Sequence, residues 1–127
     1  MKTRPVDVVR SLAFYAIFYF GTIGYVLAAF PAALMGPRAL RVVVDGWSGF
    51  HRICARVLLG ISVRVEGTLP ATGHLVALRH ESFFEAIDLP RLLDYPAVFA
   101  KAELLRIPGW GWAARTYGLV PVEREQG

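Results

Sequence analysis

The sequence predicts an α/β fold in which two N-terminal helices precede a partial, mainly parallel sheet with crossover helices. Two observations lead to this prediction. Apolar residues dominate the first 60 residues and recur there at helical spacing, whereas short apolar runs alternate with helical stretches from residue 61 onward. The second pattern has the spacing of parallel strands joined by crossover connections. We therefore divide the chain into a helical region, residues 1–60, and an α/β region, residues 61–127.

The composition favours an anionic or membrane-associated partner. Of the 127 residues, 55% are hydrophobic, and the formal net charge is +4. Positive charge attracts membrane headgroups, phosphorylated substrates and nucleic acids. The basic residues flank apolar segments rather than forming long clusters, so we expect a membrane lipid or a phosphate and no nucleic acid. A single cysteine, Cys54, excludes an internal disulfide and a cysteine-rich metal site, and we expect no metal.

The first helix is expected over Ser11–Phe30, within a stretch that has no charged residue between Arg10 and Arg38. As a helix this stretch would span roughly 30 Å, about the thickness of the hydrocarbon core of a bilayer. A cleaved signal peptide is the competing interpretation, but the run is longer than the usual apolar core of such a peptide. Internal glycines and Pro31 also allow a helix that bends or re-enters. Basic residues on both sides leave its orientation open.

A second, amphipathic helix is expected over Leu40–Ile61. The apolar face comprises Leu40, Val43, Val44, Trp47, Phe50, Cys54, Val57, Leu58 and Ile61. The opposite face comprises Arg41, Asp45, Ser48, Arg52 and Arg56. Such a basic helix can pack its apolar face on the protein core or lie in the plane of the lipid headgroups, and the pattern leaves both possibilities open.

The α/β region begins with two predicted strands. Apolar and polar residues alternate over Ile61–Glu66, and Leu75–Leu78 is a continuous apolar run between turn signals. A helix starting at Ser82 follows, and Pro90 must kink or break it. The remaining predicted elements are a strand over 97–100, a second crossover through 104–117 and a strand over 119–122.

The candidate site begins at His80, where the second predicted strand ends. Ser82 and Glu85 have the spacing of a capping box, which would start the helix at Ser82. A histidine in the turn before a helix can fold back onto a carboxylate in the first helical turn. Such a carboxylate fixes the tautomer of the imidazole and leaves the other ring nitrogen as a general base. The competing interpretation is structural, since the capping box alone accounts for Ser82 and Glu85.

Charged residues also follow the later predicted strands. Lys101 comes directly after 97–100, and Glu123 and Arg124 come after 119–122. The carboxyl ends of parallel strands lie along one edge of a sheet, where open α/β sheets bind ligands. We therefore expect His80, Lys101 and Arg124 to meet on one rim, with the two cations suited to a phosphate. The alternative is that the two cations end strands simply to reach water.

Two blocks of the sequence resemble the glycerolipid acyltransferases. The first is His-Glu-Ser-Phe-Phe-Glu at 80–85, which is similar to that family's histidine and acid separated by four residues. The second is Lys-Ala-Glu-Leu-Leu-Arg-Ile-Pro-Gly-Trp-Gly-Trp at 101–112, continued by Gly-Leu-Val-Pro-Val-Glu-Arg at 118–124. The chain resembles most the bacterial lysophosphatidic acid acyltransferases, from the apolar N-terminal segment to Arg124.

The resemblance implies an O-acyltransferase that moves a fatty acyl group from acyl-CoA or acyl carrier protein to the free hydroxyl of lysophosphatidate, giving phosphatidic acid in phospholipid biosynthesis. It implies that His80 is the base and that Glu85 orients it. Arg124 would grip the phosphate of the acceptor, with Lys101 as a helper. No cofactor beyond the acyl donor is implied. Residues 1–60 would anchor the enzyme in the bacterial inner membrane with its active site facing the cytoplasm, and 61–127 would be the N-terminal part of the acyltransferase domain.

The chain departs from the family pattern in two ways. Glu85 and Glu123 stand where aspartate is usual, and the extra methylene still permits a hydrogen bond between Glu85 and His80. The family also carries a third block, of the Phe-Pro-Glu-Gly-Thr-Arg kind, and later segments that these residues do not include. From the resemblance we therefore expect residues 1–127 alone to associate with membranes and to be inactive.

Two alternatives keep part of this picture. One retains the chemistry and changes the acceptor to another lyso-lipid, such as a lyso-ornithine lipid. The other is a non-catalytic membrane module that binds anionic lipid through arginines, namely Arg41, Arg52, Arg56 and Arg124. The module explains the first third of the chain and leaves the convergence of His80, Glu85 and Arg124 to chance.

Overall fold

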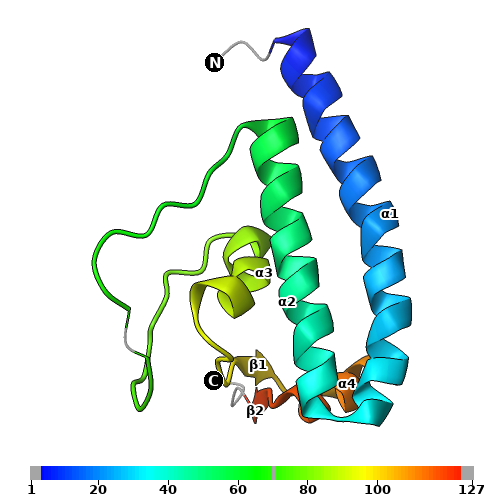
Figure 1. Ribbon diagram of the computed structural model, residues 1–127, viewed down its shortest axis with the longest axis vertical. Coiled ribbons are helices and arrows are strands. Elements are labelled where there is room, and N and C mark those ends of the chain that lie inside the picture. The colour runs from blue at the N-terminus through cyan, green and yellow to red at the C-terminus, as the bar shows by residue number, and fades with distance from the viewer. Residues whose placement is uncertain (1–3, 70, 124–127) are drawn as a thin grey trace.

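In the computed structural model, which describes residues 4–69 and 71–123, two long helices lie side by side (Figure 1). Helix α1 spans Pro5–Met35 and helix α2 spans Pro37–Cys54, and a π-helical turn, η1 (Ala55–Leu59), extends α2. Gly36 alone makes the turn between them. Its φ of 114° lies in the region that favours glycine, and its N–H donates to carbonyls in the last turn of α1. The chain therefore begins with a helical hairpin.

Aromatic side chains hold the hairpin together. The Phe18 ring of α1 stacks on the rings of Trp47 and Phe50 of α2, with centroids 6.1 Å away in both cases. Trp47 Nε1 donates to Thr22 Oγ1 at 3.0 Å. Gly21 leaves room for the Phe50 ring, since a Cβ at this position would overlap that ring. The apolar face of α2 thus packs on α1, which is one of the two fates that the sequence allowed.

The other face of α1 remains uncovered. Many of its large apolar side chains are exposed, and only 6% of its most apolar window is buried. By length and composition α1 could cross a membrane, and it is the single helix among the described residues that is long and apolar enough to do so. It is continuous through Pro31, so the helix neither stops nor re-enters there.

Later in the chain, helices α3 and α4 pack against α2, and two short strands follow α3 and α4. In order, the elements of this part of the chain are α3 (Phe83–Leu92), β1 (Phe99–Lys101), η2 (Leu104–Arg106), α4 (Trp110–Tyr117) and β2 (Val120–Val122). Strands β1 and β2 pair in parallel, with Phe99 opposite Val120 and Lys101 opposite Val122. The predicted parallel crossover through α4 is confirmed. A small core joins α4 to the turn of the hairpin, where Ala33, Leu40 and Tyr117 are buried.

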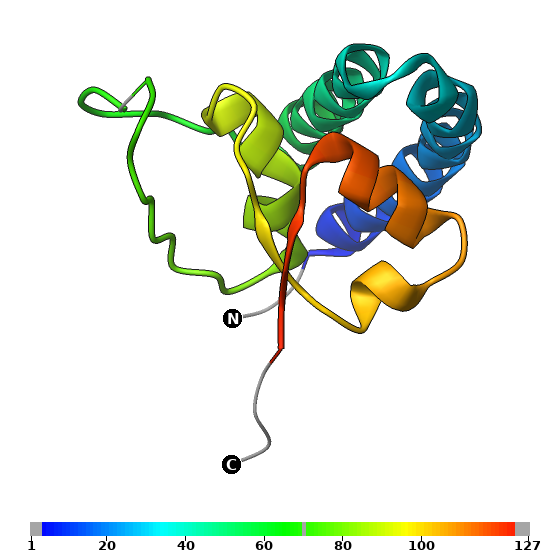
Figure 2. The same ribbon diagram turned by 90° about the horizontal axis from the view of Figure 1, so that it is seen from below.

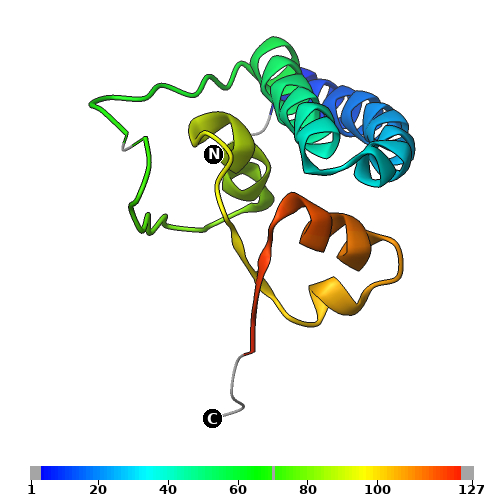
Figure 3. The same ribbon diagram turned by 60° about the horizontal axis from the view of Figure 1, so that its bottom comes forward.

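The predicted strands Ile61–Glu66 and Leu75–Leu78 are wrong. Residues 61–69 and 71–81 contain no regular element and run away from the helices as an extended excursion (Figures 2 and 3). An apolar alternation specifies a strand only where another strand supplies its backbone hydrogen bonds, and the described part of the chain offers none here. The mainly parallel sheet therefore reduces to two short strands, and the described structure is mostly helical. The α/β prediction is supported only loosely.

Several boundaries also differ from the predictions. The first helix starts and ends outside the predicted Ser11–Phe30, and the helical stretch of α2 and η1 ends at Leu59 rather than Ile61. Pro90 lies inside α3 without ending it. The second crossover, in contrast, is interrupted between η2 and α4, where Pro108, Gly109 and Gly111 predict an interruption, and Gly109 has a φ of 77°. Both strands begin one or two residues later than predicted.

Candidate active site

Helix α3 begins with the capping box that the sequence predicted. Ser82 is the N-cap in an extended conformation, and its Oγ accepts a hydrogen bond from the Phe84 N–H at 3.2 Å. Glu85 Oε2 accepts in return from the Ser82 backbone N–H at 2.8 Å and from Ser82 Oγ at 2.9 Å. The box satisfies donors that the first helical turn leaves free. This prediction is confirmed, and the capping box fixes the Glu85 carboxylate relative to the first turn of α3.

The structure brings His80 to the same carboxylate. His80 Nδ1 lies 3.8 Å from Glu85 Oε2, and the two side chains are 63% and 37% exposed. A hydrogen bond needs about 2.7–3.2 Å, so a small rotation of the imidazole would close the contact. With Nδ1 held by the carboxylate, Nε2 is free to take a proton from a substrate. The arrangement can supply a general base at the start of α3.

The environment of Glu85 favours the ionised carboxylate. The pKa of Glu85 lies below its ordinary value because the carboxylate accepts hydrogen bonds from its own backbone amide and from the amide and hydroxyl of Ser82, with a smaller contribution from the charge of His80. Glu85 is therefore an anion at neutral pH. A carboxylate anion next to His80 would stabilise the imidazolium that forms when the ring takes a proton.

Lys101, another predicted site residue, forms an ion pair away from the histidine–carboxylate pair. Lys101 ends β1, as predicted, but its Nζ lies 3.4 Å from Glu103 Oε1. Glu123 pairs with Arg106 across 3.6 Å. Within residues 4–69 and 71–123, no hydrogen bond or ion pair links Lys101 to His80 or Glu85. Arg124 lies outside the described residues.

A cavity lies beside the histidine–carboxylate pair. Its volume is about 360 Å³. It is lined by Val63, Arg64, Val65, Glu66, Leu78, Phe84, Glu85, Asp88 and Leu92. One wall is the extended segment after α2 and the other is α3, so its existence depends on the path of a segment without regular structure. No pattern in the sequence indicates this cavity.

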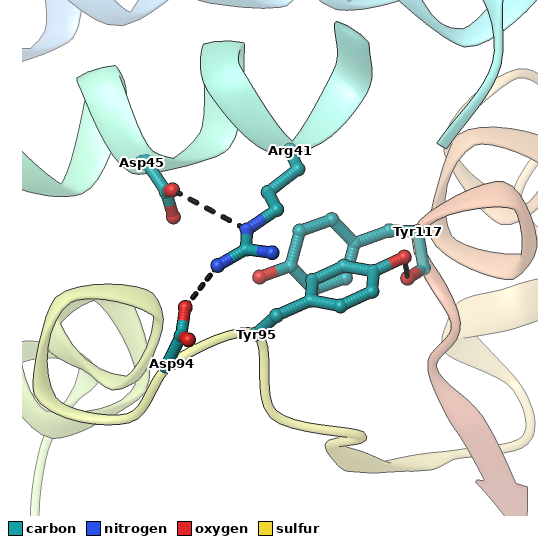
Figure 4. Close-up of polar contacts among 5 residues, drawn as sticks. All are labelled: Arg41, Asp45, Asp94, Tyr95 and Tyr117. Atoms are coloured by element: carbon teal, nitrogen blue, oxygen red, sulfur yellow. Dashed lines mark hydrogen bonds and ion pairs between the residues drawn. The ribbon is translucent and has the colours of Figure 1, made fainter. Parts of the chain in front are cut away.

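A larger cavity lies elsewhere and belongs to a structural network. It has a volume of about 460 Å³ at the turn of the hairpin and includes Arg41 and Tyr95 in its wall. As Figure 4 shows, Arg41 reaches the carboxylates of Asp45 and Asp94 and lies over the Tyr95 ring, with its guanidinium carbon 4.8 Å from the ring centroid. Tyr95 Oη donates to the Tyr117 carbonyl at 2.8 Å.

This network lies beside the start of the two-stranded sheet. Tyr95 and Tyr117 come before β1 and β2, so they lie at the amino ends of the strands, whereas ligands of open α/β sheets bind at the carboxyl ends. Burial, together with the nearby charge of Asp45, raises the pKa of Tyr117 to about 12. The phenol of Tyr117 therefore stays neutral near pH 7.

The sequence did not indicate two polar residues next to the candidate pair. Arg52 of α2 and Asp88 of α3 form an ion pair, and Asp88 is only 4% exposed. The spacing of Glu85 and Asp88 on one helix was visible, but their partner on α2 was not. In the described part of the chain no three or more His, Cys, Asp or Glu side chains gather in a group that could hold a metal ion.

Comparison with known proteins gives one informative similarity. The chain is 29% identical over 129 residues to a 1-acyl-sn-glycerol-3-phosphate acyltransferase of Pseudomonas aeruginosa. The match covers 95% of this chain and 49% of the relative, so the chain spans about half the length of that protein. No protein-family model matches the chain, and no solved structure matches it. The similarity supports a distant relationship to the acyltransferases.

Proposed function

We propose that the protein transfers a fatty acyl group from acyl-CoA or acyl carrier protein to the free hydroxyl of lysophosphatidate, giving phosphatidate. The observation that carries the proposal is the approach of His80 Nδ1 to Glu85 Oε2, at 3.8 Å, at the capped start of α3. The distant relative supports acyltransferase activity in general. The acceptor and the donor are part of the proposal.

The chemistry requires one base and a good leaving group. Nε2 of His80 takes the proton of the acceptor hydroxyl while its oxygen attacks the thioester carbonyl, and Glu85 stabilises the imidazolium that forms. The tetrahedral intermediate then expels the thiolate. The C–S bond breaks, and the thiolate recovers the proton from His80. The reaction yields an ester and a free thiol and needs no cofactor.

Two cations are proposed to bind the phosphate of the acceptor. Lys101 lies at the carboxyl end of β1, and Arg124 follows β2 by two residues in the sequence. The carboxyl ends of parallel strands share one edge, which supports a common binding site for a phosphate. Arginine can hold two phosphate oxygens at once, whereas lysine contributes a point charge.

The packing of α2 supports a position on the membrane rather than through it. Arg41, near the start of α2, pairs with Asp94, and Arg52, near its end, pairs with Asp88. Helix α3 therefore lies beside the middle of α2, and α4 lies near its start (Figure 1). If the hairpin crossed a bilayer, these helices and the ion pairs with α2 would have to enter the hydrocarbon. We propose that the exposed face of α1 lies in one leaflet, on the cytoplasmic side of a bacterial inner membrane, where both donors are found.

The experiment that tests the proposal replaces the base. In the native protein, His80→Ala should lower the transfer of labelled acyl groups to lysophosphatidate by about 10²–10⁴-fold, the usual contribution of a general base. His74→Ala is the matched control, because His74 is also exposed and lies in the same extended segment. More than a few per cent of wild-type turnover in a folded His80→Ala variant would remove His80 from this role.

The same assay separates the alternatives. Transfer to a lyso-ornithine lipid but not to lysophosphatidate would keep the chemistry and change the acceptor. Binding to anionic vesicles without any transfer would favour the non-catalytic module. In the structure, two of the arginines assigned to that module, Arg41 and Arg52, are engaged by carboxylates of the protein itself.

A further inference from the structure

Helix α3 rests on α2 along a single stripe of side chains. Phe84, Asp88 and Arg91 are spaced by four and three residues, so they lie on one face of the helix. The Phe84 ring packs edge-on against His51, with centroids 4.7 Å apart. Arg91 lies against Gly49, where an added Cβ would come within 2.9 Å of its guanidinium. The three contacts fix the rotation of α3 about its own axis.

The central contact of this stripe is an ion pair with both carboxylate oxygens engaged. Arg52 Nε donates to Asp88 Oδ1, and Arg52 Nη2 donates to Asp88 Oδ2 at 2.8 Å. Such a two-pronged contact constrains direction as well as distance. The hydrogen bond to Asp88 also raises the pKa of Arg52 above its ordinary value, so the pair stays charged. A buried carboxylate cannot leave this arginine without losing its only charge partner shown in the structure.

Glu85 lies directly beside the stripe. It is one residue after Phe84 and three before Asp88, which places it roughly 60° around the helix from Asp88. Any rotation of α3 on α2 therefore moves the Glu85 carboxylate sideways relative to His80, which is not part of the helix. Glu85, Phe84 and Asp88 also share the wall of the 360 Å³ cavity. The orientation of the candidate acid thus depends on α2.

We propose that Arg52 and Asp88 are positioning residues for the His80–Glu85 pair, and that α2 is a part of the active site as well as of the hairpin. This proposal rests on the proposed acyl transfer. In this proposal α2, which is far from Glu85 in the sequence, holds the Glu85 carboxylate within reach of the His80 imidazole. A displacement of about 1 Å at a catalytic group can cost a hundredfold in rate.

The test compares two aspartates that each bind an arginine of α2. In the native protein, Asp88→Asn should lower kcat for acyl transfer about ten- to a hundredfold and leave both KM values within about twofold, because substrate binding does not use α3 in this way. Asp94→Asn breaks the other ion pair, with Arg41 near the turn of the hairpin, and should leave kcat unchanged. The exchange Arg52→Asp with Asp88→Arg restores a pair and should recover most of the lost kcat.

A second measurement does not depend on activity. The contact between the His80 ring and the Glu85 side chain, followed by proton–proton cross-peaks in NMR, should weaken in Asp88→Asn and stay unchanged in Asp94→Asn, since only the first change frees α3 to rotate on α2. If Asp88→Asn does not fold, Arg52→Gln makes the same test from the partly exposed partner. An unchanged kcat and an unchanged contact between His80 and Glu85 in a folded variant would overturn the proposal. A wild-type protein without transferase activity would refute the proposed function, and the NMR contact would still decide the positioning role.

Discussion

Helix α2 and the segment after it, residues 61–69 and 71–80, both carry an apolar pattern, but only α2 finds partners for both its apolar and its polar residues. Its apolar residues pack on α1 and its polar residues pair with α3 and with the loop after α3. The segment 61–80 leaves Leu75 86% exposed. A helix satisfies its backbone hydrogen bonds internally, whereas a strand needs another strand beside it. Amphipathic pattern is therefore enough to specify α2 and not enough to specify a strand.

The largest effect is expected where the packed region is tightest. A Cβ on Gly111 of α4 would overlap the backbone carbonyl of Leu105, and backbone cannot move aside as a side chain can. Gly111→Ala should therefore cost about 3 kcal/mol or more of unfolding free energy, at the upper end for overpacking. Denaturation of the detergent-solubilised protein, followed by tryptophan fluorescence, measures it. Arg115→Ala, at an exposed position of α4, should stay within about 0.5 kcal/mol. Equal stability of the two variants would contradict the observed packing of α4 on η2.

The next effect on stability compares two glycines of α1, one in contact with α2 and one in open space. Gly21→Ala would press a methyl group into the Phe50 ring and should cost about 1–3 kcal/mol, since the ring can shift in part. Gly24→Ala, on the same helix, meets nothing within 4 Å and should be neutral or stabilise the helix by about 0.5–1 kcal/mol. Thermal unfolding followed by circular dichroism compares them. A larger loss of stability in Gly24→Ala than in Gly21→Ala would mean that α2 packs on Gly24 rather than on Gly21.

The sequence predicts contacts between residues that are close together in the chain better than contacts between residues that are far apart in it. The capping box and the approach of His80 to Glu85 join residues within five positions, so local spacing was sufficient to expect them. The pairing of Arg52 with Asp88 spans 36 positions and depends on how α3 lies on α2, which no local pattern reports. The parallel pairing of β1 and β2 was predicted because a crossover helix joins them. The two earlier strands failed because no neighbour was there to pair with them in the described structure.

A smaller effect on stability is expected from His51 of α2, which is buried against α1 and α3. His51 packs against the rings of Phe14, Phe18 and Phe84, and its Nδ1 has no hydrogen-bond partner among the described residues. Burial lowers the pKa of His51 below its ordinary value of 6.5, opposed by the charge of Asp88 and assisted by that of Arg52.

The lowered pKa of His51 should make the folded protein less stable in acid. Below pH 6.5 the unfolded state binds the proton first, so stability should be full above pH 6.5 and fall as the pH drops towards the folded-state pKa, by at most about 1.4 kcal/mol per unit. Unfolding between pH 5 and 8 measures this. His51→Leu should remove the slope and His74→Ala should keep it. A slope that survives in His51→Leu would have to come from another group.

The smallest change in unfolding free energy is expected at Leu75, and it tests the comparison between the packed helices and the extended segment. Leu75 and Leu105 are the same residue in opposite settings, one 86% exposed in the extended segment and the other 2% exposed beside α4. Leu105→Ala should cost about 2–5 kcal/mol, because it removes buried methyl groups and leaves a cavity. Leu75→Ala should change the unfolding free energy by less than about 0.5 kcal/mol, as is usual for an exposed position. Both variants are measured by the same denaturant titration. If Leu75→Ala costs as much as Leu105→Ala, then Leu75 is buried in solution, which means that 75–78 has found the neighbouring strand its apolar run calls for. The pattern in the sequence would then be right about this segment, and its separation from the helices would not describe the protein in solution.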